Sequence, residues 1–152
     1  MPELQDFIGV DINPVIIARD RADFAQNFRL QFLAADASIW LQDSAGPGTI
    51  LVTYGGVMEY FSAETLSAMF GTLAQYRPAA VALVEPVDPD DDLARDAASY
   101  AFELENSFSH NHKRLLEAAG YDVTSHKSLD LGGVSWVMLL AAVTVQDCAA
   151  PI

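Results

Sequence analysis

The sequence contains 152 residues and is strongly acidic, with 21 Asp and Glu against 8 Lys and Arg and a formal net charge of −13. Because proteins bind nucleic-acid backbones through clustered Lys and Arg, this balance argues against a nucleic-acid partner. The hydrophobic share of 51% and the charged share of 19% are typical of a folded chain and exclude intrinsic disorder. We therefore expect a single domain over residues 1–152 with a substantial apolar core.

The cysteine content and the hydropathy indicate a cytoplasmic protein. Cys148 is the single cysteine, so no internal disulfide can form, and no Cys–His spacing typical of a metal site occurs. No apolar run reaches the roughly 18 residues of a membrane-spanning helix, and the first residues lack a basic signal-peptide region. We expect neither a membrane partner nor a bound metal.

Strand and helix signals alternate along the chain and end in two successive strands. The expected strands are, in chain order, about 7–11, 30–35, 49–54, 80–85, 121–127 and 135–145. The expected helices are about 14–27, 63–76, 91–106 and 110–119, with a short helix or turn at about 38–42. Such alternation predicts a mostly parallel sheet with helices on both faces. The Leu131-Gly132-Gly133 stretch predicts an antiparallel hairpin between the last two strands.

Capping residues and apolar faces support these helices. Asn13, Ser62 and Ser109 are expected to cap the helices that follow them, and Gly120 is expected to end the last helix. The predicted buried faces are Val15, Ala18, Ala22 and Ala25 on the first helix and Leu66, Met69, Phe70 and Leu73 on the third. The unbroken apolar run at 49–54 is typical of a buried parallel strand.

Three of the expected strands end in residues suited to ligand binding. These are Asp11, Asp36 and the Tyr54-Gly55-Gly56 turn. In open α/β sheets, ligands bind at the carboxyl ends of the strands, where an acid often holds ribose hydroxyls. The sequence therefore predicts a nucleotide-type ligand at this edge.

An ordered series of segments carries a resemblance to a known family. The segments are FIGVDINP (7–14), FLAADA (32–37), ILVTYGGVMEYFS (50–62), ALVEPVD (82–88), HKRLLEAAGYDV (112–123) and WVMLLAA (136–142). They resemble successive strands of the class I S-adenosylmethionine-dependent methyltransferase family, from its second strand onward. The resemblance covers nearly the whole chain. It implies a three-layer α/β/α Rossmann-like sheet, mostly parallel with an antiparallel carboxyl-terminal strand, and S-adenosylmethionine as cofactor.

The resemblance also implies a set of cofactor-binding residues, namely Asp11, Ile12, Asp36, Ala37, Tyr54 and Gly55. Asp11 would hold the ribose, Asp36 would accept a hydrogen bond from the adenine amino group, and the Ala37 N–H would bond the ring. Backbone at Tyr54 and Gly55 would approach the methionine part. Each position also has a plainer interpretation, because acids commonly cap the next helix and glycines commonly end strands.

The candidates on the acceptor side are Glu59, Glu85 and His110. Glu59 would line the acceptor pocket or lie on the surface, and Glu85 would act as a base or form a buried pair. His110 and His112 are two residues apart and do not share a helical face, so exposed capping residues are the simpler interpretation. Methyl transfer depends largely on positioning, with a base needed only where the acceptor loses a proton. We expect a small-molecule acceptor reacting through O, N or C.

One element of the family pattern has no counterpart in the sequence. The family's first strand and its glycine-rich loop, Asp/Glu-x-Gly-x-Gly-x-Gly, are not found, because the nine glycines never form that spacing. We expect an amino-terminally truncated domain that binds the cofactor weakly or not at all, unless the fold closes the gap itself. Unpaired inner sheet edges would then favour homo-oligomers.

Two other functions remain open on the sequence. The first is a non-catalytic binding or assembly module derived from a methyltransferase that has lost the cofactor loop. The second is a nicotinamide-dependent oxidoreductase, which also uses an acid after its second strand. The second requires a catalytic Tyr–Lys or similar pair, and the two lysines, Lys113 and Lys127, do not supply one convincingly.

Overall fold

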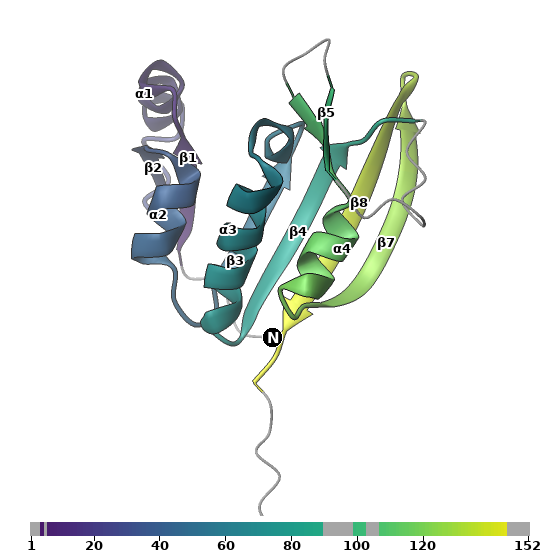
Figure 1. Ribbon diagram of the computed structural model, residues 1–152. Coiled ribbons are helices and arrows are strands. Elements are labelled where there is room, and N and C mark those ends of the chain that lie inside the picture. Colours follow the sequence, from purple (N-terminus) through teal and green to yellow (C-terminus); the bar gives the residue numbers. More distant parts are fainter. Residues whose placement is uncertain (1–3, 5, 90–98, 103–106, 146–152) are drawn as a thin grey trace, which may run out of the picture. The chain divides into compact units, whose positions relative to one another are not determined.

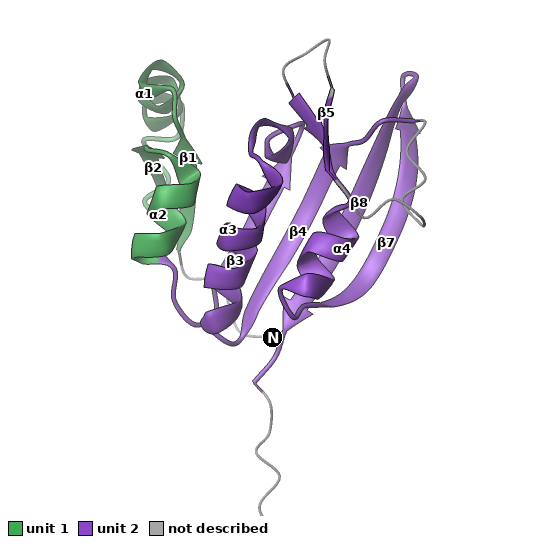
Figure 2. Ribbon diagram, viewed as in Figure 1, with its two compact units in different colours: residues 1–44 green, residues 45–152 purple. Residues whose placement is uncertain are grey.

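The computed structural model describes residues 4, 6–89, 99–102 and 107–145 (Figure 1). It divides into two compact units, residues 1–44 (unit 1) and 45–152 (unit 2), which are described separately below (Figure 2). Within the described ranges, none of the helices has the length and hydrophobicity that crossing a lipid bilayer requires.

Unit 1 is a strand–helix–strand–helix segment. Its elements are β1 (Phe7–Asp11), α1 (Pro14–Asp23), β2 (Leu30–Ala34) and α2 (Ala37–Ser44). The two strands pair in parallel from Phe7 opposite Leu30 to Asp11 opposite Ala34, so their carboxyl ends lie together. Asn13 caps α1 as predicted, because its side chain accepts a hydrogen bond from the backbone N–H of Val15 at 2.9 Å.

Helix α1 differs from the prediction in its length and in its buried face. It ends at Asp23, where the Phe24 N–H closes the last turn on the Asp20 carbonyl at 3.0 Å. The predicted face is wrong: Val15 is 73% exposed, and Ile17 is the buried residue of the helix. The reason lies one turn further along, where Arg21 donates to the Phe32 carbonyl of β2 at 2.5 and 2.9 Å. Ile17 and Arg21 share a helical face, and that face is turned toward β2.

Unit 2 is built on a four-stranded mixed sheet in the order β3-β4-β8-β7. Its elements in chain order are β3 (Ile50–Tyr54), the 3-10 turn η1 (Met58–Tyr60), α3 (Ala63–Gln75), β4 (Ala79–Pro86), β5 (Tyr100–Phe102), β6 (Ser107–Ser109), α4 (His112–Ala118), β7 (Asp122–Leu131) and β8 (Val134–Val143). Strand β3 pairs in parallel with β4, whereas β8 is antiparallel to both β4 and β7. The antiparallel carboxyl-terminal strand and the final hairpin are therefore confirmed.

The core of unit 2 lies between one face of this sheet and the helices α3 and α4, which contact each other (Figure 1). It contains the predicted face of α3 together with alternate residues of β4 and β8. Its members include Leu66, Met69, Phe70, Leu73, Val81, Leu83, Leu116, Val137, Leu139 and Ala141. Ser62 caps α3 as predicted, accepting from the Thr65 N–H at 3.2 Å. Gly120 follows α4 with a φ of +90°, as expected for a helix-ending glycine.

Three sequence expectations for unit 2 need correction. Strand β3 is not buried on both faces, since Val52 is 67% exposed. Among the described residues β3 pairs only with β4, and α3 and α4 lie on the face of the sheet opposite Val52. The helix expected at 91–106 is wrong at Tyr100–Phe102, which form β5 and pair with β6; residues 90–98 and 103–106 lie outside the described residues. Helix α4 is capped by Asn111 rather than Ser109, because pairing with Tyr100 keeps Ser109 in β6.

Candidate functional site

The carboxyl ends of β1 and β2 bring the predicted residues of unit 1 to one edge. The Ala35 N–H donates to the Asp11 carbonyl at 3.0 Å, which extends the strand pairing past Ala34 to the residue before Asp36. Asp11 Oδ1 accepts from the Asn13 N–H at 2.7 Å, and the next side chain, Ile12, is 76% exposed. This edge therefore brings Asp11 and Asp36 together, with Ile12 and Ala37 next to them in sequence.

Asp36 is fixed by hydrogen bonds at the start of α2. Its Oδ1 accepts from the Ser38 N–H at 2.8 Å and from the Ser38 hydroxyl at 2.6 Å. These bonds hold the pKa of Asp36 below its usual value, and the bond from the Ser38 hydroxyl has the largest effect. Asp11 and Asp36 both make these bonds through Oδ1, and a carboxylate accepts hydrogen bonds through two oxygens. The bond that Asp11 accepts from Asn13 and the bonds that Asp36 accepts from the start of α2 are thus compatible with ligand binding at both acids.

In unit 2 the carboxyl end of β3 leads into two glycines in the left-handed region. Gly55 and Gly56 have φ of +90° and +83°, and the Gly55 N–H continues the pairing with β4 by donating to the Val84 carbonyl at 3.1 Å. A Cβ at Gly55 would meet no atom within 4 Å, whereas a Cβ at Gly56 would clash with Oε1 of Glu59. Backbone at Gly55 is therefore open to a neighbouring molecule, and Glu59 folds back over Gly56.

Glu85, at the end of β4, is fully buried and holds the amino end of η1. Its Oε2 accepts from the backbone N–H groups of Val57 and Met58 at 2.9 and 3.0 Å. Burial raises the pKa of Glu85, and the nearby Glu59 carboxylate acts in the same direction. Glu85 Oε1 and Thr53 Oγ1 are both buried without a well-formed hydrogen bond. The Thr53 hydroxyl nevertheless offsets part of the rise in the pKa of Glu85.

His110 holds the other end of the same turn. Its Nε2 lies 3.1 Å from the Phe61 carbonyl and its Nδ1 lies 2.6 Å from the Ser99 hydroxyl. A carbonyl can only accept, so Nε2 carries the hydrogen, and in the neutral ring Nδ1 accepts from Ser99. Burial lowers the pKa of His110, which favours this neutral form.

The expectation that the two histidines are exposed caps is wrong, because both are buried and Asn111 caps α4 in their place. The rings of His110 and His112 lie 5.4 Å apart between centroids. Burial, with a smaller contribution from His110, lowers the pKa of His112 to about 3, and its Nδ1 has no hydrogen-bond partner. Sequence reasoning gave no role to Ser99 or Thr53, because a single serine or threonine has no pattern that marks it.

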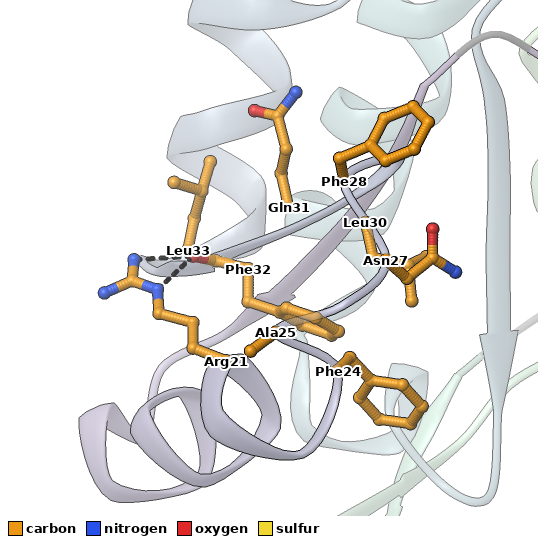
Figure 3. Close-up of a pocket in the computed structure, with 9 residues that line it drawn as sticks. All are labelled: Arg21, Phe24, Ala25, Asn27, Phe28, Leu30, Gln31, Phe32 and Leu33. Carbon is orange, nitrogen blue, oxygen red and sulfur yellow. Dashed lines mark hydrogen bonds between the residues drawn. The ribbon is translucent and has the colours of Figure 1, made fainter.

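Across the described ranges, no group of three or more His, Cys, Asp or Glu side chains is placed to hold a metal ion. Unit 1 does contain a pocket of about 330 Å³, formed around β2 and the connection that precedes it (Figure 3). Its lining residues are Arg21, Phe24, Ala25, Asn27, Phe28, Leu30, Gln31, Phe32 and Leu33. None of the predicted site residues lines this pocket, so it is distinct from the candidate site.

No protein-family model matches the sequence, and no curated protein matches it. Solved structures do match. The N-methyltransferase NodS from Bradyrhizobium japonicum superposes with a TM-score of 0.67 at 7% identity, over 92% of this chain and 74% of that one. An S-adenosylmethionine-dependent methyltransferase from Methanosarcina mazei gives 0.62 at 13% identity, over 91% and 82%. Magnesium protoporphyrin IX methyltransferase from Synechocystis, with bound S-adenosylmethionine, gives 0.59 at 16% identity, over 90% and 59%.

These likenesses concern the fold. They confirm the predicted α/β architecture, with a mixed sheet shared by Rossmann-like methyltransferases, over about nine-tenths of the chain. The chain spans 59% of the length of the Synechocystis enzyme.

Proposed function

We propose that this chain, which has the fold of S-adenosylmethionine-dependent methyltransferases, takes part in methyl transfer from S-adenosylmethionine to O, N or C of a small molecule. The observation that carries the proposal is the edge of unit 1, where parallel pairing brings Asp11 and Asp36 to the carboxyl ends of neighbouring strands. This is where open α/β sheets bind nucleotide ligands. The Synechocystis structures contain S-adenosylmethionine or S-adenosylhomocysteine, and one NodS structure contains S-adenosylhomocysteine.

The residues present fit the nucleoside part of this cofactor. Carboxylate oxygens suit the ribose hydroxyls and the adenine amino group, so we assign Asp11 with Ile12 to the ribose and Asp36 with Ala37 to the base. In unit 2, the open backbone at Gly55 suits the close approach of the methionine part. We assign Tyr54 and Gly55 to it.

Methyl transfer requires mainly that the acceptor be positioned against the methyl group. When bound, S-adenosylmethionine supplies a methyl group on a sulfonium centre, which an oriented acceptor can attack without a covalent enzyme intermediate. A base is required only where the acceptor atom must lose a proton. Of the three predicted acceptor-side candidates, Glu59 is the one that is partly exposed. Glu85 and His110 are buried, with Glu85 Oε2 bonded to the backbone of Val57 and Met58 and the His110 ring nitrogens bonded to Phe61 and Ser99. We assign the acceptor-side carboxylate to Glu59.

Titration calorimetry of the full chain with S-adenosylhomocysteine tests the proposal. We expect measurable binding that is weaker than micromolar, because no glycine-rich motif is present in the sequence. Asp11→Asn and Asp36→Asn should each weaken it about tenfold, or ~1.4 kcal/mol, through loss of a charge-assisted hydrogen bond. Asp43→Asn, in α2, is the matched control and should bind as the parent chain does.

Absence of binding at millimolar ligand would contradict the proposal and favour the non-catalytic binding or assembly module. Micromolar binding would support the methyltransferase assignment and show that the expected dependence on a glycine-rich loop is wrong. Equal binding by all three variants would overturn the residue assignment.

A further inference from the structure

Residues 57–61, which comprise η1 and one residue on each side and are here called the η1 turn, are held at both ends by buried titratable side chains. At its amino end, Glu85 Oε2 accepts from two successive backbone N–H groups, those of Val57 and Met58. At its carboxyl end, His110 Nε2 donates to the Phe61 carbonyl. The two side chains come from β4 and from the residues that follow β6, far from the turn in sequence.

The η1 turn presents a different set of side chains outward. Met58 is buried and anchors the turn, whereas Tyr60 is 65% exposed and Glu59 is partly exposed. The turn directly follows Gly55 and Gly56, whose positive φ angles set its direction as it leaves β3. Any shift of the turn would therefore move Glu59 and Tyr60 and alter the backbone at the carboxyl end of β3.

We propose that Glu85 and His110 are positioning residues that clamp the η1 turn, fixing Glu59 and Tyr60 on the acceptor side and Gly55 beside the cofactor. The positioning role rests on the proposed function, whereas the hydrogen bonds that hold the turn do not depend on it. Neither residue is assigned a contact with a substrate. They act on the site through the backbone of the turn.

The chemistry of Glu85 explains why a carboxyl group is suited to this position. The Met58 N–H makes a buried bond to Glu85 and the Val57 N–H makes a part-buried one, so an apolar side chain at position 85 would leave at least one buried donor without an acceptor. In the protonated form, which burial favours, one carboxyl oxygen still accepts both N–H bonds, and the other can donate to Thr53 Oγ1. A glutamine has nearly the same shape and likewise combines an acceptor oxygen with a donor group, its NH2. Leucine fills similar space but accepts no hydrogen bond.

The chemistry of His110 gives a parallel pair of variants. The clamp requires a donor at the position of Nε2, and Ser99 and the ring of His112 hold the imidazole in place. Glutamine can supply an N–H donor to the Phe61 carbonyl, whereas phenylalanine keeps a flat ring but has no donor.

Amide hydrogen exchange on the full chain tests the clamp directly. We expect the Val57 and Met58 amides to exchange about tenfold faster or more in Glu85→Leu and at close to the parental rate in Glu85→Gln. The Phe70 amide, in the core of α3, is the internal control for global unfolding and should remain protected in both variants. Equal exchange in the Leu and Gln variants would show that Glu85 only fills space and would overturn the proposal.

The second pair covers the case in which Glu85→Leu does not fold. His110→Phe should speed exchange of the Phe61 amide, which closes the turn on the Met58 carbonyl, and His110→Gln should restore it. If His110→Phe exchanges like the parent chain, the carboxyl-terminal half of the clamp is refuted.

Calorimetry with S-adenosylhomocysteine separates this inference from the proposed function. If the parent chain binds the ligand, Glu85→Leu should lose affinity by about tenfold while Glu85→Gln keeps it. Full affinity in a Glu85→Leu chain whose turn exchanges fast would overturn the positioning role. If the parent chain does not bind, the proposed function fails, and the exchange data still decide whether the clamp exists.

Discussion

Replacement of His112 by leucine should make unit 2 less sensitive to acid. Burial holds the folded-state pKa of His112 at about 3, whereas a histidine in an unfolded chain titrates near 6.5. As the pH falls below about 6.5, the unfolded chain therefore binds a proton that the folded chain refuses, and stability is lost until the pH approaches about 3. Each pH unit in this window is worth about 1.4 kcal/mol, so the parent chain should lose roughly 2 kcal/mol by about pH 5 through this residue.

The leucine variant removes this pH-dependent loss of stability. Because Nδ1 of His112 has no hydrogen-bond partner in the parent chain, the substitution breaks no hydrogen bond at that atom. His110, whose pKa burial also lowers, and Glu85, whose pKa burial raises, remain in both chains and cancel in the comparison. The difference between the two chains therefore isolates His112 and its interaction with His110.

The assay is urea unfolding at about pH 7.5 and about pH 5, followed by Trp136 fluorescence in a Trp40→Phe background so that β8 of unit 2 is the probe. His126→Gln, at an exposed position of β7, is the control for removal of a histidine that is not buried. The reasoning is refuted if His112→Leu loses as much stability between the two pH values as the parent chain does.

Two further substitutions test the packing and the turn. Phe70→Ala should destabilise unit 2 by about 3–5 kcal/mol, because the ring is fully buried, whereas Ser67→Ala, on the exposed face of α3, should change stability by less than about 0.5 kcal/mol in urea unfolding. Gly55→Ala should lower the stability of unit 2 by the roughly 1–2 kcal/mol of an alanine in the left-handed region. Gly56→Ala should lower it further, because a Cβ at position 56 also meets Glu59. Equal losses of stability in thermal unfolding of the two variants would contradict this prediction.

The sequence predicts most of the strands and the better part of the core, because these follow from local periodicity. The face of α3 appears every three or four residues from Leu66, and the glycines near Gly132 mark the final hairpin. The face of α1 could not be found this way. Its rotation depends on Arg21 reaching the carbonyl of Phe32, a contact between residues eleven apart that no local pattern encodes.

Long-range contacts also explain the errors around β6. Pairing between Tyr100 and Ser109 draws Ser109 into a strand and leaves the capping of α4 to Asn111. The histidines on either side of Asn111 then become buried, which spacing alone could not reveal.

The candidate site likewise has a part that local patterns predict and a part that depends on long-range contacts. Asp11, Asp36 and Gly55 lie at or just after the ends of strands, so their place at the carboxyl edges of the sheets follows from the alternation of strands and helices. The engagement of Glu85 with the N–H groups of Val57 and Met58 joins residues 28 and 27 positions apart and emerges only in the folded chain.

The central claim is that the carboxyl-terminal edges of these strands bind the cofactor. A titration of the isotope-labelled chain with S-adenosylhomocysteine, followed by backbone amide resonances, tests it most directly. We predict saturable shifts at the amides of Ile12, Ala37 and Gly55. Shifts confined to the pocket around Phe28 and Gln31, or no shifts at millimolar ligand, would contradict the account.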